Sequence, residues 1–290
     1  MQRAGLVARL TLPDALAALA EAAAWLHRRG CTPVLERDSA EAAGLAGRWT
    51  TASRDTLARD VDVVIAFGGD GTLLGAASAV VHANEDTPLL GVNLGHLGFL
   101  TEVSRADLEP ALEALVSGRT TIETRLLLKG RVMRGADLVD QHLALNDIVI
   151  TRGALSRMIE IDVYVDDRFV CHVKADGIIL ATATGSTAYN LSAGGPILHP
   201  AVDAIVFTPI APHTLTQRPL VLPAAAQIRL EPVVEPESDI LLTFDGQFGA
   251  PLGPGDVVTV GRAPRVLRLV RTSGRTHFDV LREKLKWGNP

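Results

Sequence analysis

The sequence predicts two joined folds, an α/β domain over residues 1–121 and an all-β, sandwich-like domain over residues 122–271. Three observations predict this division. Helical and strand periods alternate through the first part, one strand there is apolar along nearly its whole length, and short β-rich runs separated by turn residues fill the second part. Residues 272–290 carry a helical stretch that we expect to pack back on the first domain.

Strands and helices alternate in the first domain. Gly30 ends the first helix, and the run VDVVIAF is apolar enough for a strand buried on both faces of a parallel sheet. This alternation predicts a doubly wound, Rossmann-like α/β domain. The expected strands are 4–10, 32–36, 61–67 and 89–92, and the expected helices are 12–29, 73–82 and 106–117.

The second domain reads as β-rich throughout. Its short apolar runs are bounded by Gly, Pro, Asp or Asn, and Asp166-Asp167 between two of them predicts a hairpin. The expected strands are 123–133, 143–151, 159–165, 168–173, 177–183, 205–208, 228–231, 240–244 and 257–260.

The composition of the chain argues against several classes of protein, among them nucleic-acid-binding and membrane proteins. The chain has 28 Lys and Arg against 33 Asp and Glu, a net charge of −5, and 47% hydrophobic residues. This is globular composition without the basic runs of a nucleic-acid or membrane-surface protein. The apolar stretch 177–202 is broken by Gly, Pro and polar residues, and the two cysteines stand far apart. We therefore expect a soluble cytoplasmic protein with no nucleic-acid or membrane partner, no disulfide framework and no zinc site.

The segment GGDGT, residues 68–72, lies between a predicted buried strand and a helix. That edge of an open α/β sheet is where ligands bind, and glycines let the backbone approach a phosphate. Asp70 stands among the glycines, where a carboxylate would repel a pyrophosphate unless it has a proton-transfer role or a cation beside it. The alternative, a tight turn that only caps a helix, needs fewer glycines than are present.

Two further segments suit a nucleoside. After the expected strand 177–183 the chain reads TGSTAYNLSAGGP, which combines small hydroxyl residues with one aromatic ring. Asn146-Asp147 places an amide beside a carboxylate, a pair that can hold adjacent ribose hydroxyls, although such a dipeptide by itself is more often a turn. A glycine-punctuated loop, GVNLGHLGFL at 91–100, contains His96, for which a structural role is the simpler interpretation.

Together these segments resemble the bacterial NAD kinase family. The matching elements are GGDGT (68–72), GVNLGHLGFL (91–100), LND (145–147), DGIILATATGSTAYNLSAGGPI (176–197) and FDGQ (244–247), in the order of the family. GGDGT alone is shared with diacylglycerol kinases and phosphofructokinases, whereas the TGSTAYNLSAGGP block is specific to NAD kinases. The resemblance implies transfer of the terminal phosphoryl group of ATP, or of polyphosphate, to the 2′-hydroxyl of the adenosine ribose of NAD.

The resemblance also assigns residues to roles. Asp70 matches the general base, and Gly68, Gly69, Gly71 and Thr72 match the path of the donor phosphates, with Mg²⁺ held by those phosphates rather than by side chains. Many relatives have Glu in place of Asp147. A basic residue at position 174 accompanies a preference for NAD⁺ over NADH. The implied NAD-binding residues are Asp70, Gly71, Asn146, Asp147, Arg157, Lys174, Asp176, Thr187, Ala188, Tyr189, Asn190, Ser192, Ala211 and Gln247.

In this family some pocket residues come from a neighbouring subunit, so the resemblance implies a homodimer or homotetramer. Two other functions stay open on the sequence. A diacylglycerol-type lipid kinase would use the same GGDGT segment, and a non-catalytic NAD-sensing protein would keep the fold without the chemistry. The intact Asp70 argues against the second.

Overall fold

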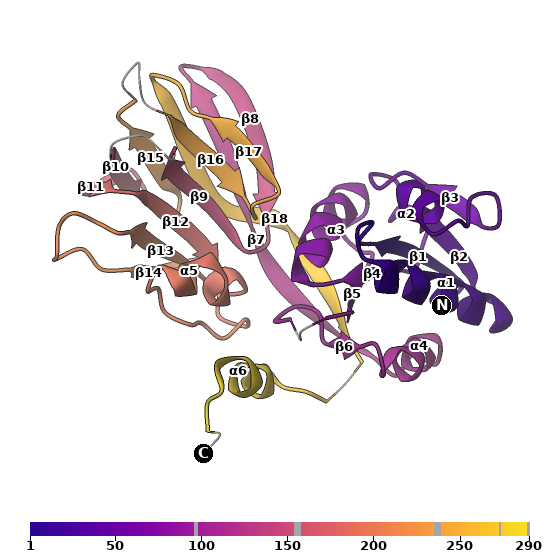
Figure 1. Cartoon of the computed structure of the whole chain (residues 1–290). Helices are drawn as coiled ribbons and strands as arrows, with labels where there is room; N and C mark the ends of the chain where they lie inside the picture. Colours follow the sequence, from indigo (N-terminus) through magenta and orange to yellow (C-terminus); the bar gives the residue numbers. More distant parts are fainter. Residues whose placement is uncertain (96–97, 154–157, 235–238, 273, 289–290) are drawn as a thin grey trace. The chain divides into compact units, whose positions relative to one another are not determined.

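The computed structural model describes residues 1–95, 98–153, 158–234, 239–272 and 274–288, and the chain divides into two compact units (Figure 1). We call them the α/β unit, Met1–Thr124 with Val266–Pro290, and the β unit, Arg125–Arg265. Among the described residues, no helix is long and apolar enough to cross a membrane.

The α/β unit is built on a parallel sheet of strand order β3-β2-β1-β4-β5. β5 also pairs in parallel with β6 and, at Leu269, with the end of β18. This arrangement confirms the predicted α/β fold of the first part. The strands are β1 (Arg3–Ala8), β2 (Thr32–Glu36), β3 (Thr50–Ala52), β4 (Val63–Gly68), β5 (Leu89–Asn93), β6 (Val103–Ser104) and β18 (Asp256–Arg271).

Helices cover both faces of this sheet (Figure 1). Leu19 and Leu26 of α1 and Leu112 of α4 share one core cluster with Ile65 and Phe67 of β4. α3 contacts β4 and β5 from the other face, since its Leu73 lies against Gly91. The helices that belong to the α/β unit are α1 (Pro13–Arg28), α2 (Arg37–Ala42), α3 (Asp70–Ala83), α4 (Leu108–Val116) and α6 (His277–Leu285).

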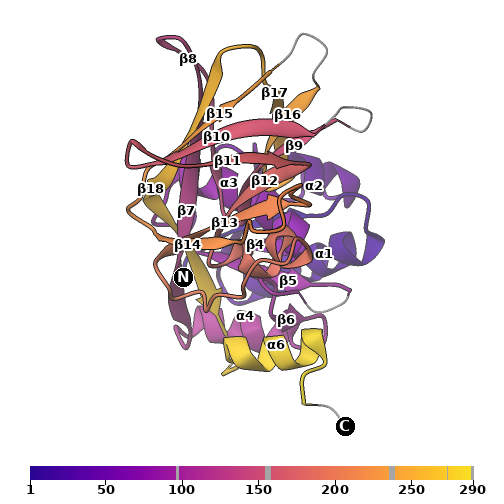
Figure 2. The ribbon, with the colours of Figure 1, turned by 90° about the vertical axis from the view of Figure 1, so that its left-hand side faces the viewer.

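The β unit consists of two sheets packed on one core, which confirms the sandwich-like prediction (Figure 2). One sheet has the order β11-β10-β15-β18, with the β7–β8 hairpin paired to β18; the other has the order β14-β13-β12-β9-β16-β17. Its strands are β7 (Thr121–Arg134), β8 (Asp137–Ala144), β9 (Asp147–Arg152), β10 (Ile159–Val165), β11 (Arg168–Ala175), β12 (Gly177–Thr182), β13 (Ala204–Ile210), β14 (Leu220–Pro223), β15 (Ile228–Pro232), β16 (Ile240–Phe244), β17 (Phe248–Pro251) and part of β18.

The predicted strand 143–151 is wrong in one respect that matters for function. The chain leaves one sheet at the end of β8 and enters the other at the start of β9, with Leu145 and Asn146 between them. The backbone N–H groups at this break are taken by a side chain, as described below, so they cannot continue a strand ladder. The predicted hairpin is confirmed, because Asp166 and Asp167 both have positive φ, 48° and 61°, between β10 and β11.

Candidate functional site

Asp70 stands at the junction of a buried strand and a helix in the α/β unit. β4 ends at Gly68, Gly69 is the N-cap of α3, and Asp70 is the first residue of that helix. The unpaired N–H groups of this first turn therefore lie at the sheet edge where open α/β sheets bind ligands. The predicted residues Gly68 to Thr72 thus come together at one helix start, although the helix begins three residues earlier than the sequence pattern indicated.

The Asp70 carboxylate is held by the loop that follows β5. Its Oδ2 accepts the backbone N–H of Phe99 at 2.7 Å, and its Oδ1 accepts the N–H groups of Leu100 and Thr101 at 3.2 and 3.0 Å. The Thr101 hydroxyl also donates to Oδ1, at 2.8 Å. The direction of the Asp70 side chain is therefore fixed by the fold of this unit.

Glycines near Asp70 serve two different purposes. A Cβ on Gly98 would lie 1.9 Å from Asp70 Oδ1 and 2.4 Å from Thr101 Oγ1, so only glycine lets the loop approach the carboxylate this closely. A Cβ on Gly69 or Gly71 would meet no atom within 4 Å, and neither residue has a positive φ. The fold itself does not require glycine at 69 and 71, and the open space there can admit a phosphate.

In the β unit, Asp245 fixes the turn that carries Asn146 and Asp147. Its Oδ2 accepts the N–H of Leu145 at 2.8 Å, and its Oδ1 accepts the N–H groups of Asn146 and Asp147 at 2.7 and 3.0 Å. The Asp245 N–H in turn donates to the Asp147 carbonyl at 2.9 Å. Three consecutive backbone donors thus converge on one carboxylate.

Sequence reasoning missed Asp245 as a functional residue. From the segment FDGQ, the sequence predicts only Gln247 as a site residue, and Gln247 is exposed beyond Asp245 in the turn between β16 and β17. The Asp-Gly pair is the sequence signal for a tight turn here, because both residues tolerate positive φ. In the structure, Asp245 and Gly246 have φ values of 52° and 61°. The turn between β16 and β17 therefore aims the Asp245 carboxylate at the β8–β9 break.

The Asp147 side chain is buried, 6% exposed, and near a second carboxylate. Burial, and then the negative charge of Asp245, raise the pKa of Asp147 to about 7. Burial also raises the pKa of Asp245, against the opposing effect of its three backbone donors. A buried acid with a raised pKa beside a second carboxylate is costly to the fold, and such pairs are typical of a functional site.

The loop after β12 packs directly on the Asn146 turn. The Thr182 hydroxyl donates to the Leu145 carbonyl at 2.6 Å, and the Thr182 N–H donates to the Asn146 carbonyl at 2.9 Å. A Cβ on Gly185 would lie 2.0 Å from that Asn146 carbonyl oxygen. The two predicted NAD-binding segments are therefore in direct contact within the β unit.

Asn190 serves this loop as a buried clamp. Its Nδ2 donates to the carbonyls of Ser186 and Pro196 at 2.9 and 3.0 Å, and its Oδ1 accepts the Thr208 hydroxyl at 2.7 Å. Its side chain is fully buried, whereas Thr187 and Ala188 are half-buried and Tyr189 is 45% exposed. The side chains of this loop that are open to solvent are therefore those around Tyr189 and Ser192.

Charged residues predicted for the dinucleotide already form pairs within the β unit. Lys174 Nζ donates to Glu160 Oε1 at 2.6 Å, which holds the pKa of Glu160 below its usual range, and Asp176 pairs with Arg152 at 2.6 Å. Ala211, at the end of β13, has φ 45°, an uncommon conformation for a residue with a Cβ. Arg157 and His96 lie outside the described residues.

A prediction follows for Asp245. Asp245→Asn keeps one oxygen acceptor but turns an N–H₂ group toward the buried turn, so at least one backbone donor there loses its partner. Losing a buried hydrogen bond costs about 1–3 kcal/mol, and we expect the KM for NAD to rise about 5- to 100-fold. Steady-state kinetics measure this.

Asp166→Asn is the matched control for that variant. Asp166 also has a positive φ, and its Oδ1 also accepts a backbone N–H, from Gln227 at 2.9 Å, but it lies in the exposed β10–β11 hairpin. We expect its KM to stay at the wild-type value. Equal values for the two variants would contradict the role given to Asp245.

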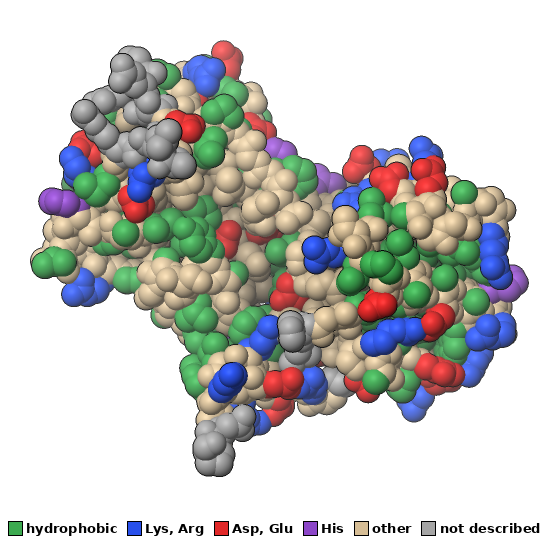
Figure 3. Space-filling view, viewed as in Figure 1, with side chains coloured by type: hydrophobic (Ala, Val, Ile, Leu, Met, Phe, Trp, Pro, Cys, Tyr) green, Lys and Arg blue, Asp and Glu red, His purple; other side chains and the backbone are tan. Residues whose placement is uncertain are grey.

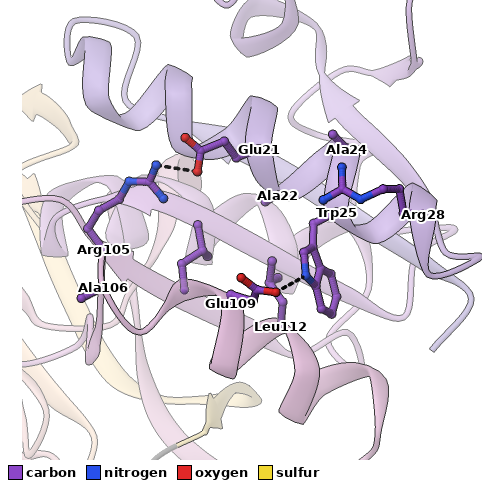
Figure 4. Close-up of a pocket in the computed structure, with 10 residues that line it drawn as sticks. Glu21, Ala22, Ala24, Trp25, Arg28, Arg105, Ala106, Glu109 and Leu112 are labelled. Atoms are coloured by element: carbon purple, nitrogen blue, oxygen red, sulfur yellow. Dashed lines mark hydrogen bonds and ion pairs between the residues drawn. The ribbon is translucent and has the colours of Figure 1, made fainter.

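The α/β unit also has a hollow of about 390 Å³ between α1 and α4, apart from these residues (Figure 4). Two pairs of its polar groups are already joined, Arg105 with Glu21 at 2.5 Å and the Trp25 indole N–H with Glu109 at 3.1 Å, and Arg28 also lines it. We assign no function to it. Within the described residues, no group of three or more His, Cys, Asp and Glu is placed to hold a metal ion.

Comparisons with known proteins agree with this geometry. Family models described as the ATP-NAD kinase N-terminal and C-terminal domains match residues 5–120 and 145–272. An NAD kinase of Citrifermentans bemidjiense is 42% identical over 288 residues, 99% of each chain, and one of Solibacter usitatus is 45% identical over 265 residues, 91% of this chain and 90% of its own.

Solved structures show the same fold. The yeast NADH kinase complexed with NADH superposes with a TM-score of 0.88 at 27% identity, covering 100% of this chain and 89% of its own. An NAD kinase from Archaeoglobus fulgidus in complex with ATP has a TM-score of 0.76 at 24% identity, covering 98% and 99%. The second likeness concerns the fold alone.

Proposed function

Because the chain belongs to the NAD kinase family, we infer that it transfers the terminal phosphoryl group of ATP to the 2′-hydroxyl of the adenosine ribose of NAD⁺, giving NADP⁺. One observation on this chain supports the reaction most directly. The Asp70 carboxylate is held in place at the start of α3, beside two glycines, Gly69 and Gly71, that the fold does not require. A carboxylate in that setting can accept the proton of an attacking hydroxyl.

We propose that the donor phosphates follow Gly68, Gly69, Gly71 and Thr72. Open space at Gly69 and Gly71 and the N–H groups of Asp70 and Gly71, which have no acceptor among the described residues, support this path. Mg²⁺ in kinase sites usually binds through substrate phosphates, and we propose that the donor phosphates rather than side chains of this chain would hold it. When bound, the ion would neutralise phosphate charge; the chain's own contribution is the backbone N–H groups. Polyphosphate fits the same chemistry.

On the β unit we propose that Asn146 and Asp147 hold the adenosine ribose. None of the described residues donates a hydrogen bond to the Asp147 carboxylate, so it can accept ribose hydroxyls, while the Asn146 amide can both donate and accept. The other proposed NAD-binding residues of this unit, with Asn190 acting through the loop it clamps, are Arg157, Lys174, Asp176, Thr187, Ala188, Tyr189, Asn190, Ser192, Ala211 and Gln247.

A homo-oligomer is proposed from the edges of the β unit. β11 and β14 are edge strands of the two sheets, and each exposes neighbouring apolar side chains, Phe169 and Val170 on one and Leu220 and Val221 on the other. Figure 3 shows hydrophobic side chains spread over this part of the surface. Exposed apolar edges are covered in most native proteins, and a second copy of the chain would do so. Light scattering at micromolar concentration measures the subunit number.

The test of the function is a kinetic matrix of NAD⁺ and NADH against ATP and polyphosphate with Mg²⁺, with diacylglycerol as an additional acceptor. We expect NADP⁺ from NAD⁺ and ATP, and a lower rate with NADH, since position 174 is basic. Turnover of diacylglycerol would point to the lipid-kinase alternative. Binding of NAD without phosphoryl transfer would point to the sensing protein.

A further inference from the structure

A chain of hydrogen bonds leads from the backbone of the β5 loop to the Asp70 carboxylate. The Gly95 N–H donates to Asn93 Oδ1 at 2.8 Å, Asn93 Nδ2 donates to Thr101 Oγ1 at 2.9 Å, and Thr101 Oγ1 donates to Asp70 Oδ1 at 2.8 Å. Asn93 is 4% exposed and Thr101 is 1% exposed, so bulk water does not replace these links.

The direction of each bond in this chain is determined. The backbone N–H of Gly95 can only donate, so the amide oxygen of Asn93 faces it and the Asn93 N–H₂ group faces Thr101. The Thr101 oxygen therefore accepts from Asn93, and its single hydrogen is left for Asp70. The threonine is thus fixed as a donor to the carboxylate.

The two oxygens of Asp70 are consequently unequal. Oδ1 accepts three donors, the N–H groups of Leu100 and Thr101 and the Thr101 hydroxyl, whereas Oδ2 accepts the Phe99 N–H. A carboxylate oxygen has two lone-pair positions, so Oδ1 is saturated and Oδ2 keeps one position open.

We propose that Thr101, oriented by Asn93, is a positioning residue for Asp70. Its hydrogen bond helps to occupy Oδ1 of the Asp70 carboxylate, so that Oδ2 is the oxygen left to accept the proton. The inference rests on the proposed NAD kinase activity. In the reaction, the proton of the ribose 2′-hydroxyl passes to Oδ2 as the bond from O2′ to the γ-phosphorus forms. The bond from that phosphorus to the β,γ-bridging oxygen breaks, and ADP leaves with those electrons.

The experiment compares isosteric variants of buried threonines. Thr101→Val removes the hydroxyl and keeps the volume, and Thr101→Ser restores the hydroxyl. Thr87→Val is the matched control, because Thr87 is also buried in the α/β unit and its hydroxyl donates to the Ala58 carbonyl at 2.8 Å, away from Asp70. Asn93→Ala removes the outer link of the chain and leaves the Thr101 hydroxyl in place. Thermal unfolding checks that each variant folds.

We expect Thr101→Val to lower kcat about 10- to 100-fold, as a misplaced reacting group does, while KM for NAD and ATP stays within about threefold. Thr101→Ser restores most of the rate, Asn93→Ala shows a smaller loss of kcat, and Thr87→Val keeps the wild-type kcat.

Two outcomes would overturn the inference. An active wild type whose Thr101→Val and Asn93→Ala variants match Thr87→Val in kcat would contradict the positioning role alone. A wild type that leaves NAD unphosphorylated would overturn the proposed function as well. Should Thr101→Val fail to fold, the comparison of Asn93→Ala with Thr87→Val decides.

Discussion

Replacing Asp70 by asparagine is expected to lower kcat for NAD phosphorylation by about 10²- to 10⁴-fold, the usual contribution of a positioned general base. The amide cannot accept the 2′-hydroxyl proton. It also brings an N–H₂ group either to the Phe99 N–H, 2.7 Å from Oδ2, or to the donors gathered on Oδ1. Because Asn keeps the volume of Asp, we expect the unit to fold and NAD still to bind. Single-turnover kinetics and a separate NAD titration measure the two effects.

Asp14→Asn controls for the chemical change itself. Asp14 is also a first-turn carboxylate of a helix in the same unit, but it is exposed and remote from GGDGT in the sequence. Its kcat should equal that of the wild type. Full activity of Asp70→Asn would remove the general base from the mechanism and leave Asp70 as an anchor of the 98–101 loop.

Replacing Asp147 by asparagine is expected to make the protein more stable at neutral and alkaline pH and a poorer binder of NAD. The pKa of Asp147 is about 7 in the folded protein against an ordinary value of 3.8. The folded state therefore holds a proton that the unfolded chain releases, and stability is lost as pH rises from 3.8 through about 7. At about 1.4 kcal/mol for each pKa unit, the loss at pH 8 is at most ~4 kcal/mol.

The measurement is urea unfolding of wild type and Asp147→Asn at pH 4 and pH 8. We expect similar unfolding free energies at pH 4 and a gain of about 2–4 kcal/mol for the variant at pH 8. Asp137→Asn, an exposed carboxylate at the start of β8, should show no such difference. A variant that loses stability at pH 8 would show that Asp147 is held ionised in the fold.

The same change should weaken NAD binding. An ionised carboxylate forms stronger hydrogen bonds with hydroxyl groups than a neutral one. The wild-type KM for NAD should therefore fall as pH rises from 6 to 8, and in Asp147→Asn it should be higher and independent of pH over this range. A gain in stability together with a higher KM for NAD would show that Asp147 contributes to ligand binding while it destabilises the folded protein.

Local sequence patterns predicted most of the fold. Strands β2, β10 and β16 begin and end at the expected residues, because each is an apolar or alternating run closed by turn residues. Short pieces were not predicted, among them α2, β3 and β14, since a few residues carry too little periodicity. β18 extends to Arg271 because it pairs with different neighbours along its length, which no local pattern encodes.

By itself, the sequence determined the fold class, the family and the segments that carry the chemistry, because these depend on residue types at fixed spacing: GGDGT, the Asn146-Asp147 pair and the loop after β12. What only the tertiary structure decided is the state of those groups. The loop 98–101 fixes Asp70 from 29 or more residues away, and Asp245 fixes the Asn146 turn from about 100 residues away. In both cases backbone N–H groups of one segment donate to a carboxylate of another. Such a contact depends on how the chain folds and cannot be predicted from residue types at fixed spacing.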